Sequence, residues 1–477
     1  MNILLISTYE LGRQPFGLAS PAAWLREAGA EVHCLDLSRE SFNEDLVRAA
    51  DVIAFYVPMH TATRLAVQLI EPVRKLNPRA HICFYGLYAP MNEAYLRGLG
   101  AQTILGGEFE EGLAGLVQRL QNGEADGSRN PEPQAGSLCY RSEPTISLAR
   151  QNFRVPDRRG LPPIEQYAHL VVPGGAHRVV GYTEASRGCK HLCRHCPIVP
   201  VYNGAFRVVQ REVVLADIRW QVGAGAQHIT FGDPDFFNGP AHALAIVEAL
   251  HREFPQLTYD ATIKIEHLLQ HAAHLRTLRD TGCLFVTSAV ESVDNAVLAK
   301  LDKGHTRADF LAVAGLCREA GLALQPTFVP FTPWTTLEGY AELLRVLAEN
   351  NLVENVAPIQ LAIRLLIPAG SRLLELDDVR QIIAPFDEAA LAYPWRHADP
   401  RMDALCAEVE EIVRSSEKLK RSREKTFARI WDAAQRAGDV NEAAQRRKHS
   451  LARKPAPRLP ALVSRAAIPY LNEPWYC

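Results

Sequence analysis

The chain has 477 residues, of which 22% are charged and 47% hydrophobic, and its 52 basic residues nearly balance 54 acidic ones. At roughly 100–200 residues per domain, this length predicts several domains, each with an apolar core. The balanced charge argues against a general polyanion binder, so no nucleic-acid partner is expected. No apolar run reaches the roughly 18 residues of a membrane helix, and the N-terminus lacks a leader signature. The sequence therefore predicts a cytoplasmic protein without a membrane partner.

The N-terminal part, residues 1–121, alternates short apolar runs with amphipathic stretches. The expected strands are 2–7, 31–35, 52–57, 81–86 and 102–105. Continuously apolar strands that alternate with helices are typical of a parallel sheet covered on both faces. We therefore predict a doubly wound α/β domain, with a ligand crevice beyond the carboxyl ends of its strands.

A linker rich in Gly, Pro, Asn and Ser is expected over residues 122–170. A second alternating series follows, with expected strands at 179–184, 228–231, 258–263, 284–289, 322–328 and 356–363. Six βα units suit an open barrel better than the closed eight-stranded form. We predict a partial (β/α)6 barrel over residues 171–375. A helical extension is expected over residues 376–477, with a Pro-rich spacer and a Cys-ended tail.

Three of the ten cysteines, Cys189, Cys193 and Cys196, form a C-x3-C-x2-C loop just after an expected strand. Three thiolates on one loop can hold three corners of a [4Fe-4S] cluster, which leaves one iron open for a substrate or cosubstrate. One alternative is a Cys3His zinc site, completed by His191 or His195, in a non-catalytic zinc-binding protein. The other alternative is a set of unrelated buried thiols.

This loop, placed after the first strand of a six-unit barrel, resembles that of the radical S-adenosylmethionine (SAM) superfamily, and the resemblance spans about residues 179–371. It implies an enzyme that cleaves SAM reductively with its cluster and starts radical chemistry on a substrate. The implied substrate is a small molecule, with compounds of sulfur, selenium or arsenic among the candidates. The implied electron donor is a protein such as flavodoxin or ferredoxin.

The resemblance also assigns SAM contacts to residues at the ends of successive strands. These residues are Gly232, Asp233, Asp235, Lys264, Glu291, Ser292 and His195. The stretch 231–236 occupies the place of the motif that binds the SAM amine, but departs from its common Gly-Gly-Glu form. Lys264 is expected at the SAM carboxylate, and His195 replaces an aromatic residue beside the adenine. Simpler roles are a turn at Gly232, a surface position for Lys264 and a helix cap at Glu291.

The N-terminal domain resembles the cobalamin-binding domain of one large radical SAM subgroup. Residues 106–110 look like its G-E-x-E stretch, whereas its D-x-H-x-x-G motif is absent. His60 is the one histidine near an expected strand end there, and we predict a capping or packing role for it. Cobalamin is therefore an additional candidate cofactor, and a cobalamin-dependent radical SAM methyltransferase is the alternative function.

A narrower resemblance is to radical SAM proteins with a CUAEP/CCAEP tail, and it rests on residues 7–17, 328–334 and 473–477. Members continue past the last cysteine with Cys or selenocysteine, then Ala-Glu-Pro. Either this tail is absent here, or the reading frame continues through a recoded stop and makes a selenoprotein. Cys477 is the candidate catalytic thiol, suited to soft electrophiles; the alternative is a terminus without a role.

Overall fold

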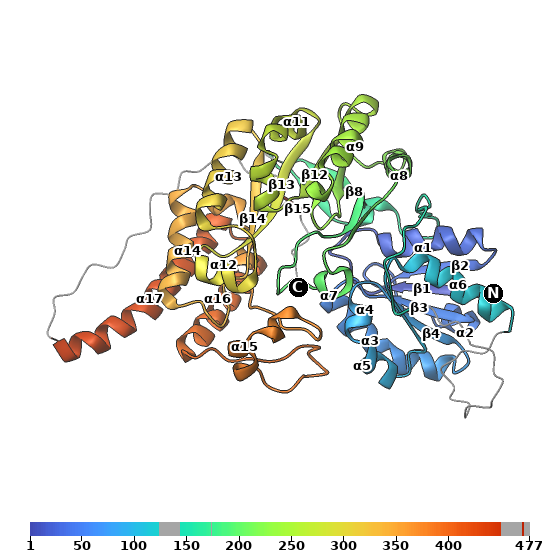
Figure 1. Cartoon of the computed structure of the whole chain (residues 1–477), viewed down its shortest axis with the longest axis horizontal. Coiled ribbons are helices and arrows are strands. Elements are labelled where there is room, and N and C mark those ends of the chain that lie inside the picture. The colour runs from blue at the N-terminus through green and yellow to red at the C-terminus, as the bar shows by residue number, and fades with distance from the viewer. Residues whose placement is uncertain (124–143, 173, 450–469, 472–477) are drawn as a thin grey trace.

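The computed structural model describes residues 1–123, 144–172, 174–449 and 470–471. An N-terminal α/β unit lies beside a second sheet that curls within an arc of helices, and C-terminal helices pack at the far end of that arc (Figure 1). The predicted fold class, a doubly wound sheet followed by a partial barrel and a helical extension, is confirmed.

The first sheet has the strand order β2-β1-β3-β4-β5-β6, and all of its strand pairs are parallel. Its apolar strands are buried on both faces, with α1 and α6 on one face and α2, α3 and α5 on the other. The strand order reverses between β1 and β3, which is where such sheets bind ligands. The bounds are β1 (Asn2–Ser7), α1 (Phe16–Glu27), β2 (Glu31–Asp36), α2 (Glu44–Ala49), β3 (Val52–Tyr56), α3 (His60–Leu76), β4 (His81–Tyr85), α4 (Tyr88–Met91), α5 (Glu93–Gly98), β5 (Thr103–Gly107), α6 (Phe109–Gln121) and β6 (Ile146–Ser147).

The second sheet has the order β14-β13-β12-β11-β8-β7-β15. In this sheet β8, β11, β12, β13 and β14 run parallel, whereas β7 and β15 add an antiparallel edge. A short hairpin of β9 and β10 follows β8. The bounds are β7 (His169–Val171), β8 (His177–Thr183), β9 (Ser186–Gly188), α7 (Val199–Tyr202), β10 (Phe206–Val208), α8 (Arg211–Gly223), β11 (His228–Phe231), α9 (Pro240–Glu253), β12 (Thr258–Thr262), α10 (Ile265–Gln270), α11 (Leu275–Asp280), β13 (Cys283–Glu291), α12 (Asn295–Leu301), α13 (Arg307–Ala320), β14 (Ala323–Phe328) and α14 (Leu337–Glu349).

The prediction of a sixth barrel strand at 356–363 is wrong. Its centre is a 3-10 helix over Pro358–Leu361, and pairing beyond β14 is limited to a bridge between Phe331 and Arg364. Pro358 has no N–H to donate to a strand partner, and its fixed φ suits the first residue of a helix. The apolar run is buried by packing without a sheet ladder.

The C-terminal helices complete the barrel core. Val409 of α16 (Pro400–Lys418) and Ile430 of α17 (Arg423–His449) belong to the same buried cluster as the barrel strands. Helix α15 (Asp377–Ile382) precedes them. A strand that the sequence did not predict, β15 (Tyr470–Leu471), pairs with β7 at the edge of the barrel sheet. No helix within the described ranges is long and apolar enough to cross a membrane.

Candidate functional site

The three clustered cysteines lie on the loop between β9 and α7. Gly188, just before the loop, has a φ of +75°, and an added Cβ would lie 2.4 Å from the Tyr202 ring and 2.5 Å from the Ala205 carbonyl. A glycine is therefore required there. Cys189 and Cys193 are buried, whereas Cys196 is partly exposed. The backbone thus holds one thiol-bearing loop in a defined conformation.

The spacing of the thiols does not match a zinc site. Among the described residues, the one group of three His, Cys, Asp or Glu side chains whose ligand atoms lie within 4.8 Å of one another contains no cysteine. Tetrahedral zinc requires sulfurs only about 3.8 Å apart. A cubane cluster is wider, because each thiolate binds a different iron. The absence of a cysteine from that group argues against a zinc site at the loop, and the cluster ligands stay a prediction.

The two histidines proposed as a fourth zinc ligand are turned to other partners. His191 Nε2 lies 3.7 Å from Asp235 Oδ2, and His195 Nε2 lies 3.1 Å from Glu291 Oε1. The second contact engages this ring nitrogen with a carboxylate, and the place of His195 beside the adenine stays a prediction. Its Nδ1 is buried without a hydrogen-bond partner.

Two lysines approach the cysteine loop. Lys264 Nζ lies 3.7 Å from Cys193 Sγ, so this lysine is a buried site residue and not a surface side chain. Lys303 is also buried, with its Nζ 3.3 Å from Glu291 Oε1. Burial acts to lower the pKa of Lys303, but Glu291 and the nearby cysteines outweigh it and raise that pKa above its usual value. Ammonium groups beside the thiols favour the thiolate form that binds metals.

Glu291 lies at the end of β13 and accepts hydrogen bonds from His195 and Lys303. Burial alone would raise its pKa, but Lys303 and then His195 lower it to about 2. Glu291 is therefore a carboxylate, held with a φ of +68° that is unusual outside glycine. It does not cap helix α12, because Asp294 has that role. Ser292 lies in the adjoining turn, where its hydroxyl accepts from the Asp294 N–H.

Gly232 and Asp233 follow β11 and pack against the turn after β8. A Cβ on Gly232 would lie 1.8 Å from the Tyr182 hydroxyl, so glycine makes room for this ring. The Asp233 carboxylate accepts from the Ala185 N–H and the Ser186 hydroxyl at 2.8 and 2.5 Å. Burial raises the pKa of Asp233 to about 7. These contacts give Asp233 a structural role, because they join the ends of neighbouring strands. Both residues also line a large cavity between the two sheets.

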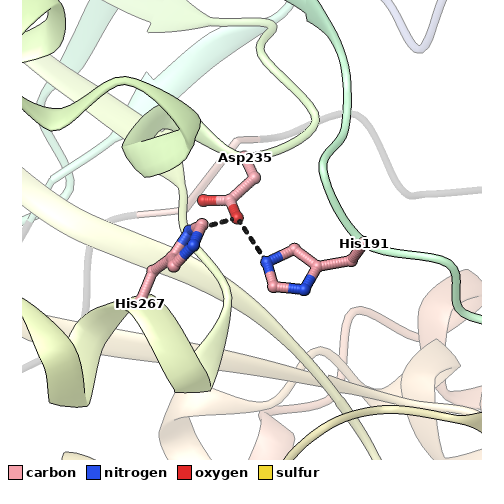
Figure 2. Close-up of side chains that lie close together, drawn as sticks. All are labelled: His191, Asp235 and His267. Atoms are coloured by element: carbon pink, nitrogen blue, oxygen red, sulfur yellow. Dashed lines mark ion pairs between the residues drawn. The ribbon is translucent and has the colours of Figure 1, made fainter. Parts of the chain in front are cut away.

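Asp235 is fully buried between two histidines (Figure 2). Its Oδ2 lies 2.7 Å from His267 Nδ1 and 3.7 Å from His191 Nε2. No motif in the sequence pointed to His267. Further histidines follow at 271, where helix α10 ends, and at 274, and this i, i+4, i+7 spacing is a signal that could have drawn attention to the segment.

A single cavity of about 1520 Å³ connects the two sheets. Its wall includes Tyr56 and Phe109, which lie at the carboxyl ends of strands in the N-terminal sheet. It also includes Cys196 of the cysteine loop, and Asp260 and Gln325 of the barrel. Ordinary small-molecule pockets measure about 300–1,000 Å³. The cavity can therefore hold more than one organic group, with the cysteine loop within reach of both sheets.

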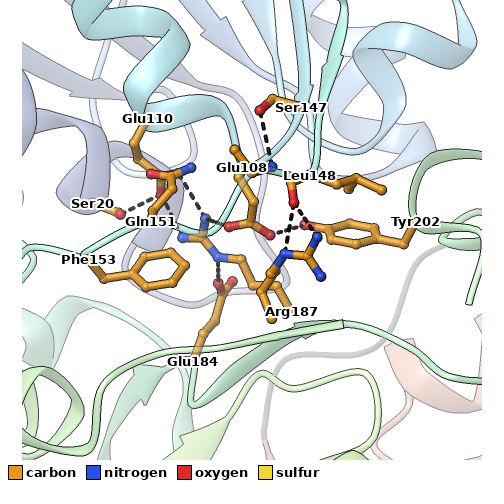
Figure 3. Close-up of polar contacts among 12 residues, drawn as sticks. Ser20, Glu108, Glu110, Ser147, Leu148, Gln151, Phe153, Glu184, Arg187 and Tyr202 are labelled. Carbon is orange, nitrogen blue, oxygen red and sulfur yellow. Dashed lines mark hydrogen bonds and ion pairs between the residues drawn. The ribbon is translucent and has the colours of Figure 1, made fainter. Parts of the chain in front are cut away.

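Next to this cavity, Arg187 joins the cysteine loop to the N-terminal sheet (Figure 3). Its guanidinium lies 2.6 Å from Glu184, 2.7 Å from Glu110 and 3.4 Å from Glu108. The Tyr202 hydroxyl donates to Glu108 at 3.1 Å. The sequence pattern identified the two glutamates of the 106–110 stretch but not the arginine that they bind.

His60 begins helix α3, and its ring contacts a distant part of the chain. Its Nε2 lies 2.6 Å from the carbonyl oxygen of Ala390, and burial lowers its pKa. This contact agrees with the packing role predicted from the sequence. It also keeps that nitrogen away from any ligand of the cavity.

Comparison with known protein families identifies the barrel. Residues 183–344, which include all three clustered cysteines, match the family model of the radical SAM superfamily. The chain therefore carries a radical SAM domain.

Two curated relatives share part of the sequence. The hopanoid C-3 methylase of Methylococcus capsulatus is 23% identical over 339 residues, which cover 69% of this chain and 64% of the methylase. The ribosomal protein uS12 methylthiotransferase RimO of Geobacter sulfurreducens is 23% identical over 177 residues, or 35% of this chain and 39% of RimO. The chain thus spans less than two thirds of the length of either relative.

Solved structures share the fold over both sheets. OxsB, a cobalamin-dependent SAM radical enzyme solved with aqua-cobalamin and SAM, has a TM-score of 0.68 at 13% identity, covering 94% of this chain and 75% of its own. TsrM of Kitasatospora setae, a radical SAM methyltransferase solved with cobalamin and a [4Fe-4S] cluster, has a TM-score of 0.58 at 17% identity and covers 73% of each chain. Membership of the CUAEP/CCAEP-tail group stays a prediction, and Cys477 lies outside the described residues.

Proposed function

We propose that this protein is a cobalamin-dependent radical SAM enzyme that methylates a small molecule. The observation that carries the proposal is the cavity, because one continuous space reaches from the carboxyl ends of the strands of the N-terminal sheet to Cys196. Relatives named as methylases and methyltransferases support methyl transfer, and structures with cobalamin support the cofactor. This is the alternative raised by the sequence, now preferred over a cobalamin-independent reaction.

In the proposed enzyme, Cys189, Cys193 and Cys196 hold a [4Fe-4S] cluster. When bound, this cluster supplies the electron that cleaves SAM. Lys264 and Lys303 place positive charge beside the thiolates. Lys264 is also near enough to the cysteine loop to form an ion pair with the carboxylate of a SAM molecule bound there. Glu291 is held as a carboxylate by Lys303 and can accept a hydrogen bond from a ribose hydroxyl of a nucleotide.

The corrin would lie against the carboxyl ends of the first sheet, where apolar and aromatic side chains of Tyr56, Met59, Leu87 and Phe109 line the cavity. Such strand ends at a change of strand order are the usual ligand position of this fold. Bound cobalamin supplies a carrier for the methyl group. His60 contributes no ligand in this proposal, because its ring is engaged with Ala390.

Anaerobic reconstitution with iron, sulfide and hydroxocobalamin tests the proposal. After desalting, we expect about one corrin per chain, measured by its visible absorbance after cyanide treatment. With SAM and dithionite, which replaces a flavodoxin or ferredoxin donor, we expect 5′-deoxyadenosine and S-adenosylhomocysteine and little methylthioadenosine. Loss of all corrin, together with 5′-deoxyadenosine formation, would contradict cobalamin dependence and support the cobalamin-independent reaction on a small molecule.

A further inference from the structure

We propose that His191, Asp235 and His267 form a mononuclear binding site for a divalent transition metal such as Zn²⁺, beside the cysteine loop (Figure 2). Two imidazole nitrogens and one carboxylate oxygen lie within 4.8 Å of one another. The three residues come from separate segments: the cysteine loop, the loop after β11, and helix α10. This ligand set suits Zn²⁺ or Fe²⁺.

The distances fit a shared metal ion. Metal–nitrogen and metal–oxygen bonds of about 2.0–2.2 Å place neighbouring ligand atoms about 3–3.5 Å apart. The observed separations from Asp235 Oδ2 are 2.7 Å to His267 Nδ1 and 3.7 Å to His191 Nε2, which bracket that range. The two histidine nitrogens lie within 4.8 Å of each other, so the imidazoles and the carboxylate already surround one point that an ion can occupy after the side chains adjust.

The three facing atoms lack any other partner. His191 Nε2, Asp235 Oδ2 and His267 Nδ1 are buried without a hydrogen bond, even though two of them lie 2.7 Å apart. A buried polar atom without a partner costs free energy, and such atoms are few in native proteins. One cation would satisfy all three atoms at once.

The other atoms of these side chains are held in place. Asp235 Oδ1 accepts from the Phe237 N–H at 3.2 Å and lies 3.5 Å from the Lys264 N–H, so Oδ2 is directed to the histidines. His191 Nδ1 lies 3.4 Å from Glu266 Oε2. A carboxylate behind a histidine is the usual support of a metal-binding imidazole.

The site is distinct from the cluster ligands and does not depend on cobalamin. With three protein ligands, it leaves a coordination position for water or for a donor atom of a bound molecule. A metal-free His-Asp-His charge network is the competing explanation for the same side chains. Metal content separates the two, because only the proposed site holds a stoichiometric ion.

The test uses the full-length protein with its iron–sulfur cluster reconstituted, so that the three cysteines are occupied. The protein is dialysed anaerobically against Zn²⁺, passed over a chelating resin, and analysed for zinc and iron. We expect about one zinc per chain, and at least a tenfold loss of zinc in His267→Ala and Asp235→Asn at unchanged iron. The control is His271→Ala, a neighbouring histidine outside the group, which should keep its zinc.

Zinc X-ray absorption gives a second readout in the wild-type protein alone. The proposal expects nitrogen and oxygen scatterers with two imidazoles and no sulfur. Equal zinc in wild type and His267→Ala, or zinc bound through sulfur, would overturn it. If a variant loses iron or its circular dichroism changes, the wild-type absorption spectrum still decides.

Discussion

Two buried charge clusters, one at the barrel mouth and one between the two sheets, are built differently. At the barrel mouth, one carboxylate, Glu291, faces Lys303 and His195, and its pKa falls to about 2. At the domain interface, Arg187 faces three carboxylates, and burial raises the pKa of Glu108 to about 7 despite that arginine.

The difference indicates different tasks. At the barrel mouth, Lys303 pairs with Glu291, and Lys264 lies 3.7 Å from Glu266. Both lysines adjoin the cysteines, so this cluster is suited to compensating the charge of thiolates and of a bound anion. In the interface cluster, Arg187 is already surrounded by acceptors from both sheets. That cluster is suited to holding the two parts of the chain together. Variants at each cluster test this division of tasks.

Replacing Cys193 should abolish the function of the barrel mouth. We expect Cys193→Ala to lose the brown absorbance near 400 nm and all SAM cleavage, because two remaining thiolates cannot hold the cluster stably. Iron analysis and product chromatography measure both effects. Cys317→Ala, in the buried core, is the control and should retain cluster and activity. A Cys193→Ala protein with normal iron and SAM cleavage would remove the cluster assignment.

Replacing Arg187 should damage stability first. Arg187→Met leaves the buried carboxylates of Glu108 and Glu110 and the partly exposed one of Glu184 without their cation, and we expect a loss of about 3–5 kcal/mol in the free energy of unfolding. Chemical denaturation measures this loss. Arg211→Met, which removes an exposed arginine paired with Glu212, should cost only about 0–1 kcal/mol. Equal losses in the two variants would show that the interface cluster does not join the sheets.

The raised pKa of Glu108 predicts a pH dependence. Between its ordinary value of 4.5 and about 7, the folded protein binds a proton that the unfolded chain releases, so stability falls as pH rises through this window. The difference amounts to up to about 3 kcal/mol. Glu108→Gln should remove this part of the pH dependence of unfolding, whereas the exposed Glu111→Gln should not. Identical pH profiles for wild type and Glu108→Gln would refute the shift.

The smallest effect is expected at His60. His60→Ala removes one contact with the Ala390 carbonyl and should cost about 1 kcal/mol of stability. Corrin retained after reconstitution should equal that of wild type, measured by absorbance. If the variant loses its corrin while its unfolding curve stays normal, the ring is a cofactor ligand after all.

The local signals of this sequence were informative where one segment holds the whole feature. The cysteine spacing located the cluster loop, and continuous apolar runs predicted β1 and β11 with the bounds that the structure has. The run at 356–363 shows the limit, because burial alone does not distinguish a strand from a packed loop with a 3-10 turn. Likewise, the sequence assigned Asp233 to a ligand motif but did not indicate that its carboxylate accepts hydrogen bonds from Ala185 and Ser186, and its contact with SAM stays a prediction.

The sequence by itself determined the class of chemistry, because three thiolates on one short loop need no distant partner to form a metal-binding unit. Only the tertiary structure decided which charges meet. Arg187 and Glu110 are 77 residues apart, and His191 and Asp235 lie on different loops. Such pairs form when the fold brings the carboxyl ends of parallel strands together. A local sequence pattern does not predict which distant side chain a residue at a strand end will contact.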